Sequence, residues 1–413
     1  MKKGKEIKPH IGIFGRRNFG KSSLINCLAG QEIAIVSDTA GTTTDPVKKS
    51  FEITGLGPVV LIDTAGIDDE GDLGKKRIQK TLDTVKIIDL AILVIANNIF
   101  GAFERNLIRE FKYYETPYFI VHNKSDLKPI KNELYTFLRQ EYRVPVISFS
   151  TVTCKEQDYL EELITQIKVS IPENAYKAPS LIGDLVSYGD IVLLITPIDI
   201  EAPAGRLILP QVQMIRDILD NDCVAIVLKE REIDAFLRKT GIKPKLAITD
   251  SQIFLKADAS ISKDIPLTGF SVVLARLKGD FENYLKGTPK ISDLKDGDRI
   301  LLLESCSHHI SCDDIGRVKI PRWISKFTGK KLEYDVVSGL DNLSRPIQDY
   351  ALVIQCGGCM ITQKQIKNRL KPAIEAGIPV TNYGMSIAWV QGIYKRAVAP
   401  FIKDYEAGDT DYL

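Results

Sequence analysis

Residues 11–23 (IGIFGRRNFGKSS) place an apolar run, two glycines and a Lys-Ser pair in the order of the phosphate-binding loop G-x-x-x-x-G-K-[ST]. The glycines let the backbone turn and approach a phosphate, and the N–H groups of the loop and the following helix point at its oxygens. The lysine reaches the β- and γ-phosphates, and the serine hydroxyl binds Mg2+. A chance glycine turn is the competing interpretation, which the later motifs disfavour. The predicted nucleotide-binding residues here are Gly15, Asn18, Phe19, Gly20, Lys21, Ser22 and Ser23.

A polar, threonine-rich segment follows at residues 37–46. A threonine in such a loop binds Mg2+ only while a γ-phosphate is present, which makes the loop a switch. We expect Thr43 to join Ser22 as a Mg2+ ligand and to act in catalysis with Lys21, while Thr42 contacts the nucleotide. A plain threonine-rich turn is the alternative.

Residues 59–62 read as a buried strand that leads into Asp63-Thr64-Ala65-Gly66. An aspartate at a strand end holds Mg2+ through a water molecule, and a glycine N–H at this place senses the γ-phosphate. The pattern D-x-x-G is weak alone, but it is strong at this distance from a P-loop. We therefore expect both Asp63 and Gly66 to line the nucleotide site.

The base of the nucleotide is indicated by Asn123-Lys124-Ser125-Asp126, which follows the apolar run of residues 118–122. The aspartate of an N-K-x-D motif accepts two hydrogen bonds from N1–H and the exocyclic amine of guanine. Adenine offers neither donor and would leave a charge unpaired, so the motif favours GTP over ATP. A second guanine contact is expected at Ser150 and Thr151, with Ser148 as the competitor.

A second group of reactive side chains lies in the last quarter of the chain. Cys306 follows the apolar run 300–303, and Cys356 and Cys359 form a C-x-x-C pair after residues 351–355. Open α/β sheets place ligand sites at such strand ends. Three thiolates and an uncertain fourth ligand, with His308 a candidate, suit an iron–sulfur cluster, and they also suit Zn2+ as Cys3His. A redox C-x-x-C pair and unliganded thiols are the remaining interpretations.

The chain of 413 residues is too long for one core, so two or three domains are expected. The strand and helix patterns predict an α/β fold with a P-loop GTPase domain at residues 1–172, followed by two smaller parallel-sheet domains. Residues 173–268 form the middle domain, for which we favour dimerisation over a filler role. Residues 269–413 form the metal-bearing domain, and its first 17 residues, 269–285, show helical spacing of apolar residues.

The composition excludes several classes of protein. A formal charge of +2, from 55 basic and 53 acidic residues, argues against a general nucleic-acid-binding surface. No apolar run approaches the roughly 18 residues of a membrane span, and seven cysteines in so long a chain do not suggest a secreted disulfide scaffold. We expect a cytoplasmic protein.

The order of the first four motifs resembles that of the translation-factor-related GTPases, and G-T-T-x-D with D-T-A-G-I resembles the tRNA-modification and ribosome-assembly branches. This resemblance implies a K+ ion at Asn18 that adds positive charge beside the phosphates. It also implies slow, K+-stimulated hydrolysis of GTP to GDP, because Ile67 stands where Ras-like enzymes carry a water-orienting glutamine. Thr44 departs from the arginine usual in the tRNA-modifying branch.

The whole chain resembles the iron–iron hydrogenase maturation GTPases (HydF), in which C-x-H precedes H-C-x-x-C. Cys306, His308, Cys356 and Cys359 match this pattern, whereas Gln355 replaces the histidine before Cys356. The resemblance implies a 4Fe-4S cluster on the three cysteines and a transient di-iron precursor. It also implies a homodimer or higher oligomer, with radical-SAM maturases and apo FeFe-hydrogenase as partners.

Two alternatives come from other classes of protein. The first is a tRNA-modification or ribosome-assembly GTPase whose cysteines bind zinc. The second is an interaction module with a vestigial GTPase domain, which measurable GTP turnover would exclude.

Overall fold

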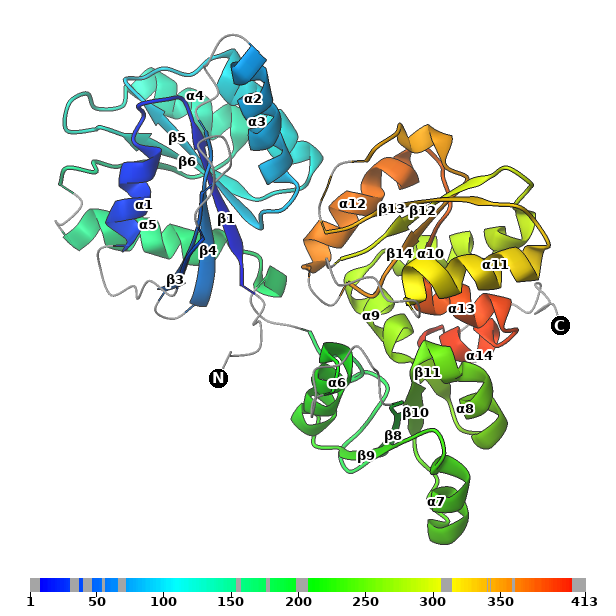
Figure 1. Ribbon diagram of the computed structural model, residues 1–413. Helices are drawn as coiled ribbons and strands as arrows, with labels where there is room; N and C mark the ends of the chain where they lie inside the picture. Colours follow the sequence, from blue (N-terminus) through cyan, green and yellow to red (C-terminus); the bar gives the residue numbers. More distant parts are fainter. Residues whose placement is uncertain are drawn as a thin grey trace. The chain divides into compact units, whose positions relative to one another are not determined.

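The computed structural model (Figure 1) divides into two compact units, Met1–Ala178 and Pro179–Leu413. The described residues are 8–29, 37–39, 47–53, 56–65, 72–153, 157–175, 179–197, 207–305, 314–339, 341, 343–358 and 361–402.

The first unit contains a seven-stranded sheet in the order β2-β3-β4-β1-β5-β6-β7, in which β2–β3 and β3–β4 are antiparallel and the other pairs are parallel. Its strands are β1 His10–Gly15, β2 Ser37–Thr39, β3 Val47–Ile53, β4 Gly57–Asp63, β5 Leu90–Ala96, β6 Tyr118–Asn123 and β7 Val146–Ser148. Its helices are α1 Lys21–Ala29, α2 Asp72–Val85, α3 Ala102–Tyr113, α4 Asn132–Tyr142 and α5 Gln157–Ser170, with a 3-10 turn η1 at Glu173–Ala175.

Helices cover both faces of this sheet (Figure 1). Apolar side chains of α1 and α5 pack on one face, and those of α2, α3 and α4 pack on the other. Strands β5 and β6 are therefore buried along their whole length, and their sequences are nearly continuous apolar runs. The expected strand–loop–helix order around the P-loop is confirmed.

The second unit contains two four-stranded parallel sheets, β11-β10-β8-β9 and β13-β12-β14-β15. The first is built of β8 Ile191–Ile195, β9 Val224–Leu228, β10 Leu246–Thr249 and β11 Leu267–Gly269. The second is built of β12 Arg299–Leu303, β13 Glu333–Val337, β14 Leu352–Gln355 and β15 Val380–Asn382. The predicted fold class, a P-loop domain followed by two parallel-sheet α/β domains, is confirmed.

The helices of this unit are α6 Leu209–Asp220, α7 Ile233–Thr240, α8 Phe254–Ser260, α9 Phe270–Lys278, α10 Phe281–Gly287, α11 Ile320–Thr328, α12 Gln363–Glu375, α13 Tyr383–Val390 and α14 Tyr394–Val398. A π-helical turn, η4, spans Ile315–Lys319, and 3-10 turns are η2 Ser251–Ile253, η3 Thr288–Asp293, η5 Ile347–Asp349 and η6 Ala399–Phe401.

The helical pattern of residues 269–285 is divided between two helices, α9 and α10, where a continuous stretch was expected. The backbone is extended at Gly279, and the Asp280 side chain accepts a hydrogen bond from the N–H of Asn283 at 3.2 Å. The aspartate thus caps a new helix. The helical spacing of apolar residues continues across this break, because both helices contribute side chains to the same core.

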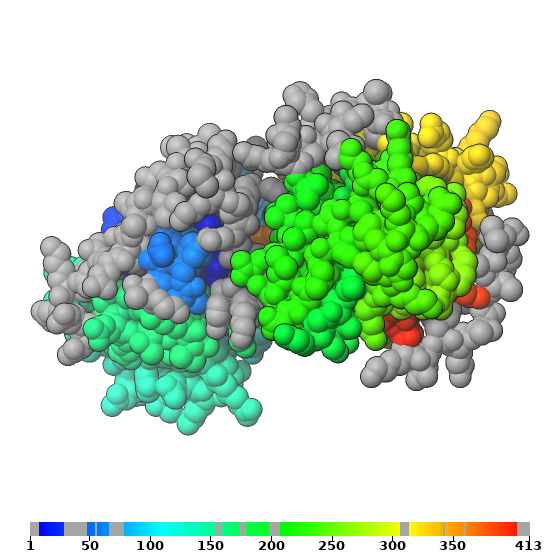
Figure 2. All heavy atoms as spheres, turned by 90° about the horizontal axis from the view of Figure 1, so that it is seen from below, coloured from blue at the N-terminus to red at the C-terminus, as the bar shows by residue number. Residues whose placement is uncertain are grey.

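Helix α9 belongs to the cores of both sheets. Phe270, Val273 and Leu274 pack with β8 and β10, whereas Val272 and Ala275 pack with β12 and β14. In Figure 2 the segments of the middle sheet form one continuous green face, which yellow and red segments of the later residues adjoin.

Arg396 of α14 ties the last helices to the middle sheet. Its guanidinium donates to the carbonyl oxygens of Ile261, Ser262 and Ile265 at 3.1, 2.6 and 3.0 Å, just beyond the end of α8. It also pairs with Asp258 at 2.6 Å. One side chain therefore satisfies several groups of the other segment. Within the described part of the chain, no helix combines the length and apolarity that crossing a bilayer requires.

We predict that Arg396→Met destabilises the second unit by about 2–3 kcal/mol, because it removes charge-assisted hydrogen bonds from partly buried carbonyl groups. The chain's two tryptophans, Trp323 and Trp389, both lie in this unit, so their fluorescence in urea measures its unfolding. The matched control is Arg216→Met, since Arg216 is exposed and forms a surface ion pair with Asp220 one helical turn away. Equal urea midpoints for the two variants would contradict the assigned role.

Candidate functional site

The backbone of the P-loop requires glycine at two positions. Gly15 has φ +145°, and an added Cβ would overlap the carbonyl oxygen of Val94. Gly20 has φ +89°, and an added Cβ would overlap the side-chain nitrogen of Asn123. Asn18 also has positive φ, at 61°. The loop therefore lies against β5 and β6 as closely as a phosphate-binding turn must.

Lys21 begins α1 and folds back over the loop. Its ammonium donates to the carbonyl oxygens of Gly15 and Arg16, both at 3.0 Å, and only 7% of the residue is exposed. Neighbouring Phe19 is buried, whereas Ser22 and Ser23 are exposed. The buried cation is thus held at the mouth of the loop by neutral acceptors, which suits it to an anionic ligand.

Ser22 and Asp63 are brought together from α1 and the end of β4. The serine hydroxyl donates to Asp63 Oδ2 at 2.6 Å, and Asp63 Oδ1 has no hydrogen-bond partner among the described residues. Burial raises the pKa of the Asp63 carboxyl, against the opposing effect of the Ser22 hydrogen bond and of Lys21 and Lys49. A hydroxyl beside an unsatisfied carboxylate oxygen is an oxygen donor set of the kind that Mg2+ takes together with water and phosphate.

The N-K-x-D motif lies at the end of β6, beside the P-loop. Asn123 is fully buried and donates from Nδ2 to the Phe19 carbonyl oxygen at 2.8 Å, which joins the two motifs. Lys124 has positive φ, at 59°, and directs the chain outward. Asp126 is exposed and accepts from the Ser150 hydroxyl at 2.6 Å.

Ser150 is therefore a neighbour of the predicted guanine-reading carboxylate. Its hydroxyl oxygen accepts from the N–H groups of Val152 and Thr153 at 3.2 and 3.4 Å. These bonds fix the loop that carries Thr151, so that Ser150 can orient Asp126. The contact of Ser150 and Thr151 with guanine stays a prediction.

An ion pair that the sequence did not suggest anchors the P-loop to α3. Arg16 donates to Glu104 through Nε at 2.8 Å and through its terminal nitrogen at 3.0 Å. Glu104 is fully buried and also accepts from the N–H of Gly101 at 2.7 Å. Burial alone would raise the pKa of Glu104, but the bonds from Arg16 and Gly101 outweigh it and lower the pKa. The two residues are far apart in sequence, so no local pattern signals the contact.

Several predicted residues lie outside the described part of the chain. They are Thr42, Thr43, Gly66, Cys306, His308 and Cys359.

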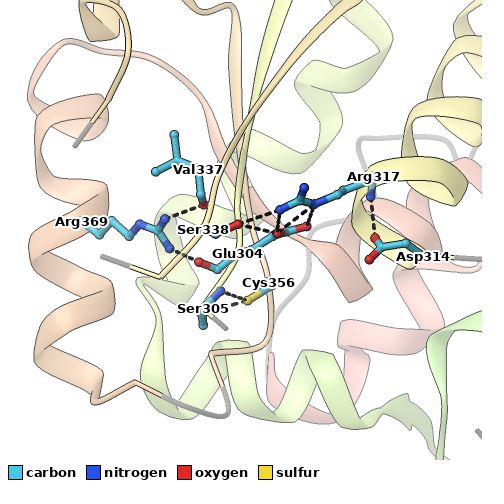
Figure 3. A network of polar contacts seen from close by, with 8 residues as sticks. All are labelled: Glu304, Ser305, Asp314, Arg317, Val337, Ser338, Cys356 and Arg369. Carbon is cyan, nitrogen blue, oxygen red and sulfur yellow. Dashed lines mark hydrogen bonds and ion pairs between the residues drawn. The ribbon is translucent and has the colours of Figure 1, made fainter. Parts of the chain in front are cut away.

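Cys356, the described member of the predicted cysteine set, follows β14 directly (Figure 3). Its sulfur faces Ser305, the residue second after β12, at 3.1 Å from the backbone nitrogen and 2.9 Å from the hydroxyl oxygen. The pairing of β12 with β14 brings the ends of these strands together, as the sequence predicts. Gly358 has φ +68°, which turns the chain after the sulfur.

Two arginines from other elements bind groups at the ends of β12 and β13. Arg317 of η4 binds the buried carboxylate of Glu304 through two nitrogens, at 2.7 to 3.1 Å, and the hydroxyl of Ser338 at 2.7 Å. Arg369 of α12 donates to the carbonyl oxygens of Glu304 and Val337 at 2.6 and 2.7 Å (Figure 3). Burial lowers the pKa of Arg369, against the opposing effect of the Cys356 sulfur.

Lys278, the last residue of α9, binds the chain that follows Cys356. It is 7% exposed and donates to the carbonyl oxygens of Gly358 and Ile361 at 2.9 and 3.3 Å. One ammonium group therefore links α9 to the backbone at both of these residues.

The described residues contain no group of three or more metal-binding side chains. Cys356 itself fits the role of a thiolate ligand, because its sulfur lies beside two hydrogen-bond donors of Ser305 and within electrostatic reach of the Arg369 guanidinium.

Three segments match protein-family models. Residues 10–124 match a model described as a 50S ribosome-binding GTPase, so the first unit holds a GTPase domain. Residues 181–279 match the hydrogen maturase F dimerization domain, and residues 282–400 match the hydrogen maturase F tetramerization domain. The chain belongs to the hydrogen maturase F family. The GTPase part of the chain is also similar to other GTPases, as the curated relatives show.

The curated relatives match a part of this chain. GTPase Era of Rippkaea orientalis is 33% identical over 180 residues, which is 42% of this chain and 56% of that protein. The tRNA modification GTPase MnmE of Histophilus somni is 39% identical over 161 residues, 38% of this chain and 34% of that protein. The chain thus spans about half or less of these relatives.

Among solved structures, the G domain of the T. maritima FeoB iron transporter is 23% identical and has a TM-score of 0.31. The alignment covers 40% of this chain and 98% of that one.

In this hydrogen maturase F chain, Asp126→Asn should weaken GTP binding at least roughly tenfold, because an amide cannot accept from both N1–H and the exocyclic amine of guanine. Xanthosine triphosphate, which has a carbonyl in place of that amine, should bind the variant better than GTP does. Titration of both nucleotides against the wild type and the variant measures this change in nucleotide preference. An unchanged ratio of the two affinities would remove Asp126 from the base site.

We also predict that Glu104→Gln lowers the affinity for GTP roughly tenfold, because the Arg16 guanidinium loses its charged partner and the P-loop its anchor. The control is Glu110→Gln, on the same helix but away from the loop. The affinity is measured with a fluorescent GTP analogue. The temperature is one at which circular dichroism shows both variants to be folded. If both variants bind GTP like the wild type, the pair has no positioning role.

Proposed function

We propose that this chain is a GTP-hydrolysing scaffold and carrier of hydrogenase maturation. In this proposal it binds a 4Fe-4S cluster and assembles or transfers the di-iron precursor to apo FeFe-hydrogenase. The observation that carries the proposal is the environment of Cys356, a strand-end sulfur that faces donors and cations within the segment matching the hydrogen maturase F tetramerization domain.

The cluster would be held by Cys306, Cys356 and Cys359, with His308 as a further candidate ligand. When bound, such a cluster supplies iron with an exchangeable coordination position. Ser305 would hold the sulfur of Cys356 in place, and the nearby guanidinium groups would offset the negative charge of three thiolates.

The nucleotide would be bound by the P-loop and read by Asn123, Lys124 and Asp126. On this proposal Lys21 exchanges the carbonyl oxygens of Gly15 and Arg16 for phosphate oxygens, and Asp126 accepts from guanine. Hydrolysis of the terminal phosphate requires a positioned water and positive charge on the phosphate oxygens. Lys21 supplies part of that charge directly.

Two cations complete the nucleotide site in this proposal. Ser22, Asp63 and, in the GTP state, Thr43 would hold Mg2+, with Thr42 and Gly66 beside the phosphates. Asn18 would hold K+. These ions stabilise the phosphate charge, so K+ should stimulate a slow basal rate.

Oligomerisation is supported by the descriptions of the two family models, dimerization and tetramerization. A homodimer or higher oligomer is therefore proposed, with the radical-SAM maturases and apo FeFe-hydrogenase as partners. We further propose that the GTP state gates the exchange of these partners. A Lys21→Ala protein that binds no GTP but matures hydrogenase at the normal rate would refute this gating.

The decisive prediction concerns Cys356. After purification without oxygen and reconstitution with iron and sulfide, we expect about four irons per chain and the broad visible absorption of sulfur-to-iron charge transfer. Cys356→Ser should lose most of the iron, because an alcohol is a poor ligand for iron at neutral pH. Cys223→Ser is the matched control, since Cys223 is a buried free thiol of the middle domain.

The alternative, a tRNA-modification or ribosome-assembly GTPase with a zinc site, has support from the names of the curated relatives. It predicts a colourless protein with stoichiometric zinc and retained RNA. Metal analysis of the same sample separates the two functions, and zinc without iron would overturn the cluster while leaving the GTPase domain intact.

A further inference from the structure

We propose that Gln355 and Ser305 form a hydrogen-bond relay that positions the Cys356 sulfur and tunes its electron density, and that Gln355 is not itself a cluster ligand. This inference rests on the proposed function, because it assigns roles to two residues beside the proposed cluster. Both are positioning residues that act through Cys356.

The relay begins at the amide of Gln355, whose side chain is fully buried. Its Nε2 donates to the Ser305 hydroxyl oxygen at 3.1 Å and to the Cys356 carbonyl oxygen at 3.2 Å, and it lies 3.5 Å from the Cys356 sulfur. Since the serine oxygen already accepts from the amide, its own proton is available to the sulfur at 2.9 Å. The backbone N–H of Ser305 adds a further donor at 3.1 Å.

The orientation of the Gln355 amide follows from the same contacts. The reversed amide would set Oε1 against the Cys356 carbonyl oxygen and the sulfur, both of which are acceptors. The strand itself is fixed, because the Gln355 carbonyl oxygen accepts from Asn382 of β15 at 3.3 Å. The nitrogen therefore faces the sulfur.

Packing alone does not account for a glutamine at this place. Gln355 Oε1 is buried and has no hydrogen-bond partner among the described residues, and leaving such an acceptor unpaired costs free energy. A leucine would fill similar volume without that cost. The amide is explained by the hydrogen bonds that its nitrogen makes toward Ser305 and Cys356.

Hydrogen bonds to a ligating sulfur withdraw electron density from it and stabilise the reduced form of a cluster, which raises the reduction potential. The relay would do so at one of the three cysteines only. It also explains how a chain without the family's histidine before Cys356 retains an ordered sulfur, because the glutamine occupies that position as a donor and not as a ligand.

The test uses the full-length protein, reconstituted with iron and sulfide. Gln355→Leu and Ser305→Ala should retain the iron and sulfide content of wild type, while an EPR-monitored redox titration shows a lower reduction potential in each. Because the two residues act in series, the double variant should shift the potential by less than the sum of the single shifts. Gln391→Leu is the control, since Gln391 also buries an Oε1 without a hydrogen-bond partner among the described residues but is not one of the residues bonded to the sulfur.

The outcomes are distinct. Loss of iron from Gln355→Leu, with the control intact, would make Gln355 a ligand and overturn the inference. Unchanged potentials and EPR spectra in both single variants would also overturn it. Wild-type protein that takes up no iron would instead overturn the proposed function. If Gln355→Leu does not fold, Gln355→Met keeps the length of the side chain, removes the amide donor and gives the same comparison.

Discussion

Parallel strand pairing is the constraint on which the proposed sites depend. In a parallel pair both strands end at the same edge, so the residues that follow them meet without any direct sequence proximity. The ends of β1 and β4 deliver the P-loop and Asp63 to one place, and β6 adds Asn123. The ends of β12 and β14 likewise deliver Ser305 and Cys356. The same geometric rule thus gathers the residues of the nucleotide site and those around Cys356.

Cationic side chains in both units donate to main-chain carbonyl groups. Lys21 binds the P-loop, Arg369 binds the ends of β12 and β13, and Lys278 binds the loop after Cys356. A carbonyl dipole accepts a hydrogen bond from a cation without itself carrying a full negative charge. These bonds fix the position of each cation beside the P-loop or beside the segment that follows Cys356.

Local motifs made much of this predictable. The P-loop, the strand before Asn123 and the strand before Cys356 are contiguous in sequence, so apolar runs and glycine spacing located them. The contact of Arg16 with Glu104 and that of Gln355 with Ser305 could not be predicted from the sequence. Each contact joins residues of two different elements, and tertiary packing sets how those elements lie against each other. The break at Gly279 was missed for a related reason, since apolar spacing records burial and not helix continuity.

Helix α9 contributes its side chains to two hydrophobic cores, one on each of its sides. The two sheets, β8–β11 and β12–β15, therefore pack against the same helix. Unfolding of either sheet would expose apolar surface of the other. In evolutionary terms, the two sheets and helix α9 form one structural unit. A recombination event that separated residues 181–279 from residues 282–400 would leave both fragments with an open core.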